Sequence, residues 1–220
     1  MIKTLYFDKQ IIVCEKPSGI LSQADSSGGK NMPDVLKKET GSYYVEAVHR
    51  LDKPVGGVMV YARSREAAGV LSRDVKERRF GKEYLAVVHG KPEAMSGTYR
   101  DFMFKDRAHC KSYVVKTERK GAKEAILEYD LLETVGDLSL VKVRLKTGRT
   151  HQIRVQFSHR AMPLLGDEKY GGAADKCPIA LFSHRLAFKH PKTKKEMEFT
   201  LFPKNTFPWN KFSAIKNDLQ

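Results

Sequence analysis

The chain has 220 residues, and its 40 Lys and Arg against 26 Asp and Glu give a formal net charge of +14 and a pI near 9.6. Its three cysteines show no CxxC spacing and its histidines no HExxH pattern, so neither a disulfide framework nor a metal site is predicted. No run of eighteen apolar residues exists, and the start has neither signal-peptide nor transit-peptide character, which argues against a membrane span and against export.

The charge and the length together indicate a class of protein. A pI this high is typical of a protein that binds a polyanion, and nucleic acid is favoured over a membrane surface because no basic amphipathic helix with a bulky apolar face is evident. A hydrophobic content of 41% suits one domain over residues 1–220 with a substantial core. We therefore predict a single cytoplasmic domain that acts as a monomer on a nucleic acid.

The amino-terminal part contains two predicted strands and one predicted helix. The run IIVCEKP, Ile11–Pro17, is predicted to be a strand that ends at its proline and a Ser-Gly turn, and a Gly/Ser-rich loop, residues 22–31, follows it. The β-branched run GVMVYAR, residues 57–63, is the second strand, and residues 64–80 are predicted to form a helix capped by Ser64. Its apolar positions recur at helical spacing: Ala67, Ala68, Leu71 and Val75.

The rest of the chain is dominated by strand patterns. The candidates, several of them alternating, are KEYLAVVHG (82–90), KSYVVKT (111–117), AILEYDLLETV (125–135), LSLVKVRLKT (138–147), IALFSHRLAF (179–188) and EMEFTLF (196–202). The segment HQIRVQFSHRA, residues 151–161, is predicted to be a helix because Ile153, Phe157 and Ala161 fall on one face. Since strands outnumber helices without regular alternation, we predict an α+β fold around a large, mixed but mostly antiparallel sheet.

Five blocks combine charged residues with turn residues. They are HRLDKPVGG (49–57), KEYLAVVHG (82–90), KTGRTHQIRV (146–155), PLLGDEKYGG (163–172) and FSHRLAFKHP (182–191). HRLD in this context, the Lys-x-Tyr strand and TGRTHQIRV resemble the signatures of the RluA-type family of RNA pseudouridine synthases, as does IIVCEKPSGIL near the start. The resemblance covers nearly the whole chain, from about Ile11 to about Phe202.

The resemblance implies a fold and a reaction. The family fold is a mixed, mainly antiparallel and bent sheet with flanking helices and a basic RNA-binding cleft. Many relatives carry an additional amino-terminal S4-like RNA-binding domain, which we do not expect here because ten residues precede the first matching strand. The implied reaction isomerises uridine in structured ribosomal or transfer RNA to pseudouridine: the N1–C1′ bond breaks and the base rejoins through C5, without a cofactor or metal.

The resemblance also assigns catalytic residues. Asp52 matches the catalytic aspartate, and a carboxylate can attack either C1′ of the ribose or C6 of the base, a choice that the sequence leaves open. Arg154, in HQIR, matches the arginine that pairs with this aspartate and favours its ionised form. Tyr84 matches the tyrosine that stacks on the target uracil. We prefer this positioning role to transfer of the C5 proton, because a free phenol has a pKa of about 10.

Residues beside Asp52 are predicted to contact RNA. By resemblance, Arg50 occupies the gap that is left when the target base is flipped out of the RNA, a step that costs a few kcal/mol of stacking and pairing. Strand-like local geometry would put Arg50 and Asp52 on the same side of the chain. His49 then points the other way, either as a structural residue or as a phosphate contact.

The segment before Arg154 and the 163–172 block complete the predicted site. A turn at Gly148 is expected to bring the next residues to the cleft. Those residues are predicted to bind RNA phosphate and sugar or to orient Arg154: Arg149, Thr150, His151 and Gln152. Two residues of the 163–172 block match the family's G-D-x-x-Y-G loop and either brace the site or form an ordinary turn: Asp167 and Tyr170.

One departure from the family pattern follows Asp52. Relatives usually have Thr-Ser before the last glycine of this block, whereas this chain has Val55-Gly56. A hydrogen bond that supports the turn is then either missing or supplied by the backbone. The rigidity of the Asp52 turn, and with it the reaction rate, is what this departure puts in question.

An alternative function on the same fold is a catalytically silent RNA-binding or ribosome-assembly factor, for which an Asp52→Ala variant would do everything that the parent does. A glycosidase is the third possibility and the weakest, because no second carboxylate stands beside the motifs. The choice of RNA and uridine is expected to depend on cleft shape and on the loops 22–31 and 100–111. Residues 207–219 are expected to form either a short helix that anchors Trp209 or a further RNA contact.

Overall fold

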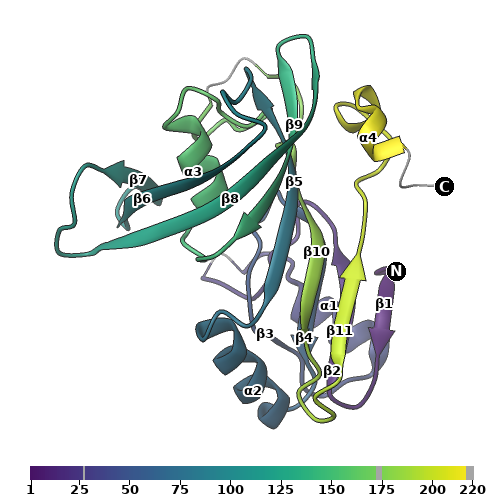
Figure 1. Cartoon of the computed structure of the whole chain (residues 1–220). Coiled ribbons are helices and arrows are strands. Elements are labelled where there is room, and N and C mark those ends of the chain that lie inside the picture. Colours follow the sequence, from purple (N-terminus) through teal and green to yellow (C-terminus); the bar gives the residue numbers. More distant parts are fainter. Residues whose placement is uncertain (27, 172–174, 217–220) are drawn as a thin grey trace. The chain divides into compact units, whose positions relative to one another are not determined.

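The computed structural model of the chain describes residues 1–26, 28–171 and 175–216 (Figure 1). Three parts of the predicted segments lie outside the described residues: Ser27 of the loop 22–31, Gly172 of the 163–172 block, and residues 217–219 of the carboxyl-terminal segment. The chain divides into two compact units. Unit 1 comprises Met1–Lys82 and Phe182–Pro203, and unit 2 comprises Glu83–Leu181 and Lys204–Gln220.

Unit 1 is built on a mixed sheet. Its strands lie in the order β1 (Thr4–Phe7), β2 (Ile11–Lys16), β4 (Gly56–Ala62) and β10 (Leu181–Lys189), with β3 (Glu46–Ala47) beside β4 and β11 (Glu196–Thr200) beside β10. β10 runs parallel to β4, and the other pairs are antiparallel. The residues of β2 and β4 are almost all buried, which explains their continuous apolar sequences. The strands predicted at β2, β4, β10 and β11 are confirmed.

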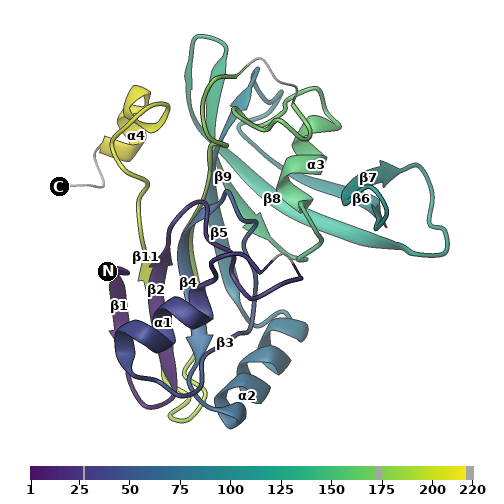
Figure 2. The same ribbon diagram turned by 180° about the vertical axis from the view of Figure 1, so that it is seen from behind.

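Two helices belong to unit 1. The helix α2 (Arg65–Lys76) begins as predicted, with Ser64 Oγ accepting a hydrogen bond from Ala67 N at 3.1 Å, and it packs against β4 (Figure 2). It ends four residues before the predicted end, because Arg78 adopts a left-handed backbone conformation with φ of 60°. The helix α1 (Met32–Thr40), which the sequence pattern did not predict, is capped by Asn31 and ends at Gly41.

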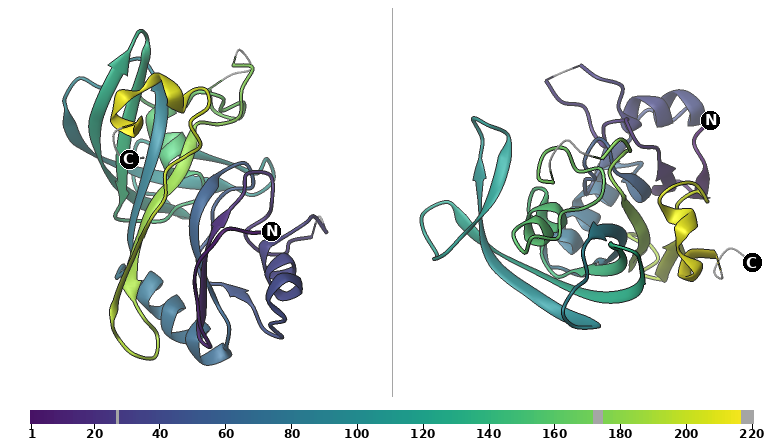
Figure 3. Two further views of the ribbon diagram at one scale, coloured as in Figure 1. Left: turned by 90° about the vertical axis from the view of Figure 1, so that its right-hand side faces the viewer. Right: turned by 90° about the horizontal axis from the view of Figure 1, so that it is seen from above.

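Unit 2 is built on an antiparallel sheet in the order β5 (Gly81–His89), β9 (Leu138–Leu145), β8 (Ala122–Val135), β6 (Ser96–Asp106) and β7 (Lys111–Val115). The β8–β9 register shifts between Leu131 and Glu133, which marks a bulge, and the long strands β6 and β8 are curved (Figure 3). The predicted α+β fold with a mainly antiparallel sheet is confirmed. The predicted loop 100–111 was wrong, because residues 100–106 belong to β6, where residues 100–104 pair with β8 and residues 102–106 pair with β7.

The short helices of unit 2 are α3 (Gln152–Ser158), the 3₁₀ helix η1 (Trp209–Lys211) and α4 (Ser213–Lys216). The prediction of a helix at α3 is confirmed, but Ala161 lies beyond its end, is exposed and has φ of 57°. The predicted short helix near Trp209 is also present, and Glu133 of β8 accepts a hydrogen bond from Ala214 N at 2.9 Å. No described helix has both the length and the apolar character that crossing a membrane requires.

Candidate active site

The HRLD segment is an irregular loop between β3 and β4 of unit 1, and its side chains alternate in burial. His49 and Leu51 are buried, Arg50 is exposed and Asp52 is half-buried. The predicted alternation is therefore observed, with His49 towards the core and Arg50 and Asp52 away from it. A backbone hydrogen bond from Val55 N to Asp52 O, 3.0 Å long, closes the turn that follows Asp52, here called the Asp52 turn (residues 52–55).

A buried lysine stabilises the Asp52 turn through hydrogen bonds to its backbone. Lys16 is fully buried at the end of β2, and its Nζ donates hydrogen bonds to the carbonyl oxygens of Pro17, Lys53 and Val55 at 2.9, 3.1 and 2.7 Å. Burial lowers the pKa of Lys16 to about 8, and the negative charge of Asp52 acts in the opposite direction. Lys16 therefore fixes the backbone of the turn and places a positive charge within electrostatic reach of Asp52.

Two serines after β2 add further support to the same loop. Ser22 Oγ donates to Leu51 O at 2.7 Å and accepts from Leu51 N at 3.0 Å, so it fixes both polar groups of the residue before Asp52. Ser18 Oγ donates to Pro54 O at 2.7 Å. Together with Lys16, these hydroxyl groups supply side-chain hydrogen bonds to the backbone of residues 51–55. An effect of Val55-Gly56 on the rigidity of the turn or on the reaction rate stays a prediction.

His49 lies beneath the loop as a neutral imidazole. Its Nε2 accepts a hydrogen bond from Val60 N at 3.2 Å, and its ring centroid lies 6.1 Å from that of Phe80. Burial and, to a smaller extent, the charge of Lys82 lower the pKa of His49 to about 3. A buried and uncharged imidazole offers a phosphate no positive charge, so the structural role of His49 is favoured over the phosphate contact.

Gly57 explains why this block ends in a second glycine. Its φ is 122°, and a Cβ atom at this position would lie 2.3 Å from Ser183 O of β10. Only glycine can adopt this backbone conformation while the two strands approach so closely. Gly57 thereby fixes the point at which the chain leaves the Asp52 turn and enters the sheet.

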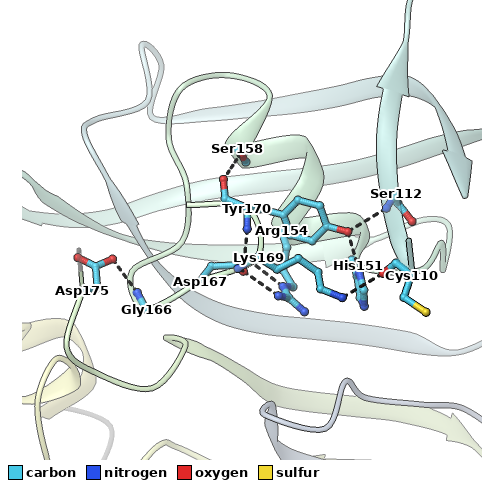
Figure 4. A network of polar contacts seen from close by, with 10 residues as sticks. All are labelled: Cys110, Ser112, His151, Arg154, Ser158, Gly166, Asp167, Lys169, Tyr170 and Asp175. Atoms are coloured by element: carbon cyan, nitrogen blue, oxygen red, sulfur yellow. Dashed lines mark hydrogen bonds and ion pairs between the residues drawn. The ribbon is translucent and has the colours of Figure 1, made fainter. Parts of the chain in front are cut away.

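In unit 2, Arg154 is anchored by a carboxylate. The helix α3 places Arg154 with 7% of its surface exposed, and its Nε and Nη2 donate to the two carboxylate oxygens of Asp167 at 2.8 and 2.7 Å. Asp167 is 1% exposed, and its Oδ1 also accepts from the backbone N of Lys169 and Tyr170 at 3.1 and 3.2 Å (Figure 4). Two backbone amides therefore orient Asp167, which in turn orients the guanidinium.

Tyr170 connects this ion pair to two other elements. Its ring centroid lies 5.2 Å from Arg154 Cζ, within the range of a cation–π interaction. Its hydroxyl group lies 2.7 Å from His151 Nδ1 and accepts a hydrogen bond from Ser112 N of β7 at 2.9 Å (Figure 4). These contacts support the bracing role of Asp167 and Tyr170 over an ordinary turn. We call Arg154, Asp167, Tyr170 and His151 the Arg154 cluster.

The loop that carries Asp167 is itself fixed at Gly166. This residue has φ of 75°, and a Cβ atom there would lie 2.4 Å from Pro178 O, so glycine is required. Gly166 N donates to Asp175 Oδ2 at 2.9 Å, and the same oxygen lies 2.8 Å from His89 Nε2 of β5. The burial-induced rise in the pKa of Asp175 is outweighed by the hydrogen bonds from His89 and Gly166, which leave it below its ordinary value.

The amide of Gln152 is used within the protein. Gln152 is buried, its Oε1 accepts from Thr147 Oγ1 at 2.8 Å and from Arg149 N at 2.9 Å, and its Nε2 donates to Gln156 Oε1 at 3.0 Å. Thr147 in turn accepts from Ile126 N of β8 at 2.8 Å. The Gln152 amide thus fixes the start of α3, and this internal use disfavours the predicted contact with RNA. The other predicted role, orienting Arg154, stays a prediction.

The neighbouring residues are more accessible. Arg149, Thr150 and His151 are each half-buried, and Arg149 Nε donates to Glu124 O at 2.7 Å. Within residues 147–151, the residue with a left-handed backbone conformation is His151, with φ of 57°, whereas Gly148 has no positive φ. These three residues keep enough exposed surface for the predicted RNA contacts.

The predicted site residues are divided between the two units. Unit 1 contains His49, Arg50 and Asp52, whereas unit 2 contains Tyr84, Arg154 and the loop 149–152. Tyr84 lies on β5 opposite Val143 of β9, with 6% of its surface exposed. The ion pair between Asp52 and Arg154 stays a prediction. Within residues 1–26, 28–171 and 175–216, no group of three His, Cys, Asp or Glu side chains is arranged to hold a metal ion.

Sequence reasoning did not identify the residues whose side chains donate hydrogen bonds to the backbone of residues 51–55. Lys16, Ser18 and Ser22 lie in the segment KPSGILS, which was noted as a strand end and a turn. Two signals could have singled out Lys16. It lies in IIVCEKPSGIL, which resembles a family signature, and it is a lysine at the end of an apolar strand, where an unpaired charge would be costly.

Comparisons with known proteins support one family. The family model described as RNA pseudouridylate synthase matches residues 10–159. The chain is 33% identical to the ribosomal large subunit pseudouridine synthase D of Borreliella burgdorferi, over 92% of this chain and 66% of that protein. It is 29% identical to the ribosomal large subunit pseudouridine synthase C of Haemophilus ducreyi, over 89% of this chain and 64% of that protein. The chain thus spans about two thirds of the length of these relatives.

Solved structures agree with the fold. The structure titled Human RNA Pseudouridylate Synthase Domain Containing 1 matches with a TM-score of 0.79 and 24% identity, over 94% of this chain and 85% of that chain. Human RNA Pseudouridylate Synthase Domain Containing 4 matches with a TM-score of 0.75 and 24% identity, over 92% of this chain and 89% of that chain. At this level of identity the two matches establish the fold.

Proposed function

Because the chain belongs to the RNA pseudouridylate synthase family, we propose that it converts uridine in RNA to pseudouridine, with Asp52 as the nucleophile. The observation that carries this proposal is the Asp52 turn: a half-buried carboxylate stands on a backbone that Lys16, Ser18 and Ser22 hold through hydrogen bonds. A nucleophile must be fixed in position and still open to its substrate, and this arrangement meets both demands.

The proposed reaction needs few groups from the protein. Asp52 attacks C1′ or C6, the N1–C1′ bond breaks, and the uracil turns and forms a bond from C5 to C1′. The bond to Asp52 then breaks, C5 loses a proton and N1 gains one, so that there is no net oxidation or reduction. Tyr84 supports the plane of the uracil, and Arg154 pairs with the Asp52 carboxylate and favours its charged form. Arg50, which is exposed, fills the space left by the flipped base. No cofactor is required.

The substrate and setting follow from the same proposal. Since two relatives are named for the ribosomal large subunit, structured ribosomal RNA is the preferred substrate class, and structured transfer RNA is the second. We expect residues 1–220 to act as one catalytic domain, as a monomer in the cytoplasm. The formal charge of +14 favours a groove that attracts the RNA backbone.

The test is a map of pseudouridine in the cellular RNA of a strain that lacks this protein and of the same strain expressing the parent, Asp52→Asn or Asp137→Asn. Asp137 is exposed in the β8–β9 turn and serves as a matched control. We expect a pseudouridine site that disappears with the protein and returns with the parent and Asp137→Asn. Asp52→Asn should lower the rate by more than about 10³-fold.

Two outcomes would contradict the proposal in different ways. If no site changes in RNA of any class, the protein is better described as a catalytically silent RNA-binding factor. If Asp52→Asn restores the site as well as the parent does, the enzyme assignment stands but the nucleophile is another residue.

A further inference from the structure

Unit 1 carries a second cationic feature, formed by two turns that lie side by side. The β1–β2 turn (residues 8–10) and the β10–β11 turn (residues 190–195) lie at the same end of the sheet in both views (Figures 1 and 2). His190 Nε2 and Asp8 Oδ2, 2.9 Å apart, join them. The two turns expose four lysines, which we call the lysine tip: Lys9, Lys192, Lys194 and Lys195.

The backbone of the lysine tip is well defined by hydrogen bonds. His190 is buried, its Nδ1 accepts from the backbone N of Lys192 and Thr193 at 3.3 and 3.0 Å, and its own N donates to Lys195 O at 2.8 Å. One imidazole therefore organises the whole β10–β11 turn and fastens it to the β1–β2 turn. The lysines are therefore attached to a backbone that hydrogen bonds fix in place.

The positive charge of the tip is not neutralised locally. Within the part of the chain that the structure describes, none of the four lysines forms an ion pair with a carboxylate. The nearby acids have other partners: Glu196 pairs with Lys189 at 3.3 Å, and Asp8 accepts from the backbone N of Gln10 and Ile11 at 2.7 and 2.8 Å. The tip thus presents a local excess of positive charge.

Lys194 occupies a position that glycine would suit better. Its φ is 63°, in the left-handed region that β-carbon-bearing residues adopt at a cost, and its Nζ donates to Pro191 O at 2.7 Å. The left-handed conformation itself does not require a lysine, and glycine would adopt it at lower cost. The Lys194 ammonium group donates to Pro191 O within the turn and, because the side chain is exposed, is also accessible to an anion from outside.

The tip is remote from the Asp52 turn within the same unit. Gly57, just after the turn, pairs with Ser183 of β10, and β10 continues in the parallel direction to Lys189. At about 3.3 Å per residue, these six steps place the tip about 20 Å along the sheet from Gly57. An RNA that contacts both places must extend well beyond the target uridine.

We propose that the lysine tip is a binding surface for the phosphate backbone of RNA, which engages a part of the substrate outside the reacting loop. This inference rests on the proposed function in taking RNA as the partner. The alternative use of such lysines is to keep the outer strands of the sheet from pairing with other molecules. That alternative predicts a change in solubility and none in RNA affinity.

The test compares two triple variants of equal net charge, +11 by removal of three lysines from +14. The tip variant is Lys192→Gln, Lys194→Gln and Lys195→Gln. The control variant, Lys3→Gln, Lys37→Gln and Lys38→Gln, removes three exposed lysines elsewhere in unit 1. Their affinities for purified ribosomal RNA from the strain that lacks the protein are measured against salt concentration, with phosphatidylserine vesicles as a second probe.

We expect the tip variant to bind ribosomal RNA at least about tenfold more weakly at low salt, with a salt slope smaller by about 2 to 3, since each duplex phosphate contact contributes about 0.9. The control should stay close to the parent. A single Lys194→Gly change, which relieves the backbone conformation, should leave the melting temperature unchanged or higher and still weaken binding.

Equal losses in the tip and control variants would overturn the proposal, because net charge alone would then explain binding. An unchanged RNA affinity in the tip variant, or a loss seen with the vesicles alone, would also overturn it. The measurement does not depend on turnover and can be repeated on the Asp52→Asn background. A protein without isomerase activity would therefore still report on the tip, and a failed tip would leave the proposed reaction untouched.

Discussion

The Asp52 turn and the Arg154 cluster both hold a charged side chain in place, but they use different kinds of bond. The Asp52 turn is supported through main-chain atoms, which accept hydrogen bonds from Lys16, Ser18 and Ser22. The Arg154 cluster is supported mainly through side chains, with Asp167 at its centre. Because every residue has a carbonyl group, substitutions within the Asp52 turn can preserve these hydrogen bonds. In the Arg154 cluster, by contrast, the bonds depend on the residue type at each position.

The largest effect on folding is expected at Asp167. Asp167→Asn leaves the buried Arg154 guanidinium without its carboxylate, and loss of one partner of a buried ion pair costs about 3–5 kcal/mol of unfolding free energy. Asp101→Asn is the matched control, because Asp101 pairs with Arg160 at 2.9 Å in the same unit, where Arg160 is more exposed. Urea unfolding of both variants checks this expectation, and an equal loss in the two would show that burial of the pair is unimportant.

The next effect tests the support of the Asp52 turn. Lys16→Met keeps the volume of the buried side chain but leaves three carbonyl groups without their common donor, which should cost about 3 kcal/mol. Ser18→Ala is the comparison: it removes a single hydrogen bond that is more exposed to solvent, and should lower the unfolding free energy by about 1 kcal/mol. If Lys16→Met unfolds at the same urea concentration as the parent, the lysine does not support the turn.

The same contrast explains how much of the site could be predicted. Side-chain bonds require particular residue types, so motifs such as HQIR and G-D-x-x-Y pointed to Arg154, Asp167 and Tyr170. The acceptors in the Asp52 turn left no such trace, because they are carbonyl groups, which every residue has. The donors to these groups therefore became evident only when folding brought residues 16–22 next to residues 51–55.

Strand prediction from the sequence was limited in a similar way. The predictions at β2 and β4 are confirmed because these strands are buried on both faces and their sequences are continuously apolar. β6 was missed because a charged residue, Asp101, lies between the buried Tyr99 and Met103 on the same face. Its carboxylate is paired with Arg160 and accepts from Gln156 at 2.7 Å, partners that are distant in the sequence.

A third prediction concerns the pH dependence of the unfolding free energy, which His49 beneath the Asp52 turn should affect. The folded state holds His49 with a pKa of about 3, whereas the unfolded chain has the ordinary value of 6.5, so the unfolded state binds more protons as the pH falls below 6.5. The unfolding free energy should therefore be about 2 kcal/mol lower at pH 5 than at pH 8 on account of this residue. His49→Gln retains an acceptor for Val60 N and does not titrate.

The measurement compares urea unfolding of the parent and His49→Gln at pH 8 and pH 5. We expect the variant to lose about 2 kcal/mol less than the parent on acidification. Its RNA affinity should be unchanged at pH 8, because a buried neutral imidazole does not bind phosphate. An affinity that falls while the pH dependence stays the same would favour the phosphate contact instead.

A smaller effect is expected at the edge of the Arg154 cluster. Tyr170→Phe keeps the ring beside Arg154 but removes the hydroxyl group that accepts from Ser112 N and lies against His151, which should cost about 1–2 kcal/mol. Hydrogen exchange of the Ser112 amide reports directly on this bond, and Tyr113→Phe, on the same strand and more exposed, is the control.

Faster exchange confined to Ser112 would mean that the Tyr170 hydroxyl group stabilises β7 alone. Faster exchange throughout α3 would mean that the side chains of the cluster act as one unit, so that even its outermost hydrogen bond helps to position Arg154. We expect the second result, because Tyr170 contacts both Arg154 and His151. Unchanged exchange at Ser112 would contradict both outcomes and remove Tyr170 from the support of the site.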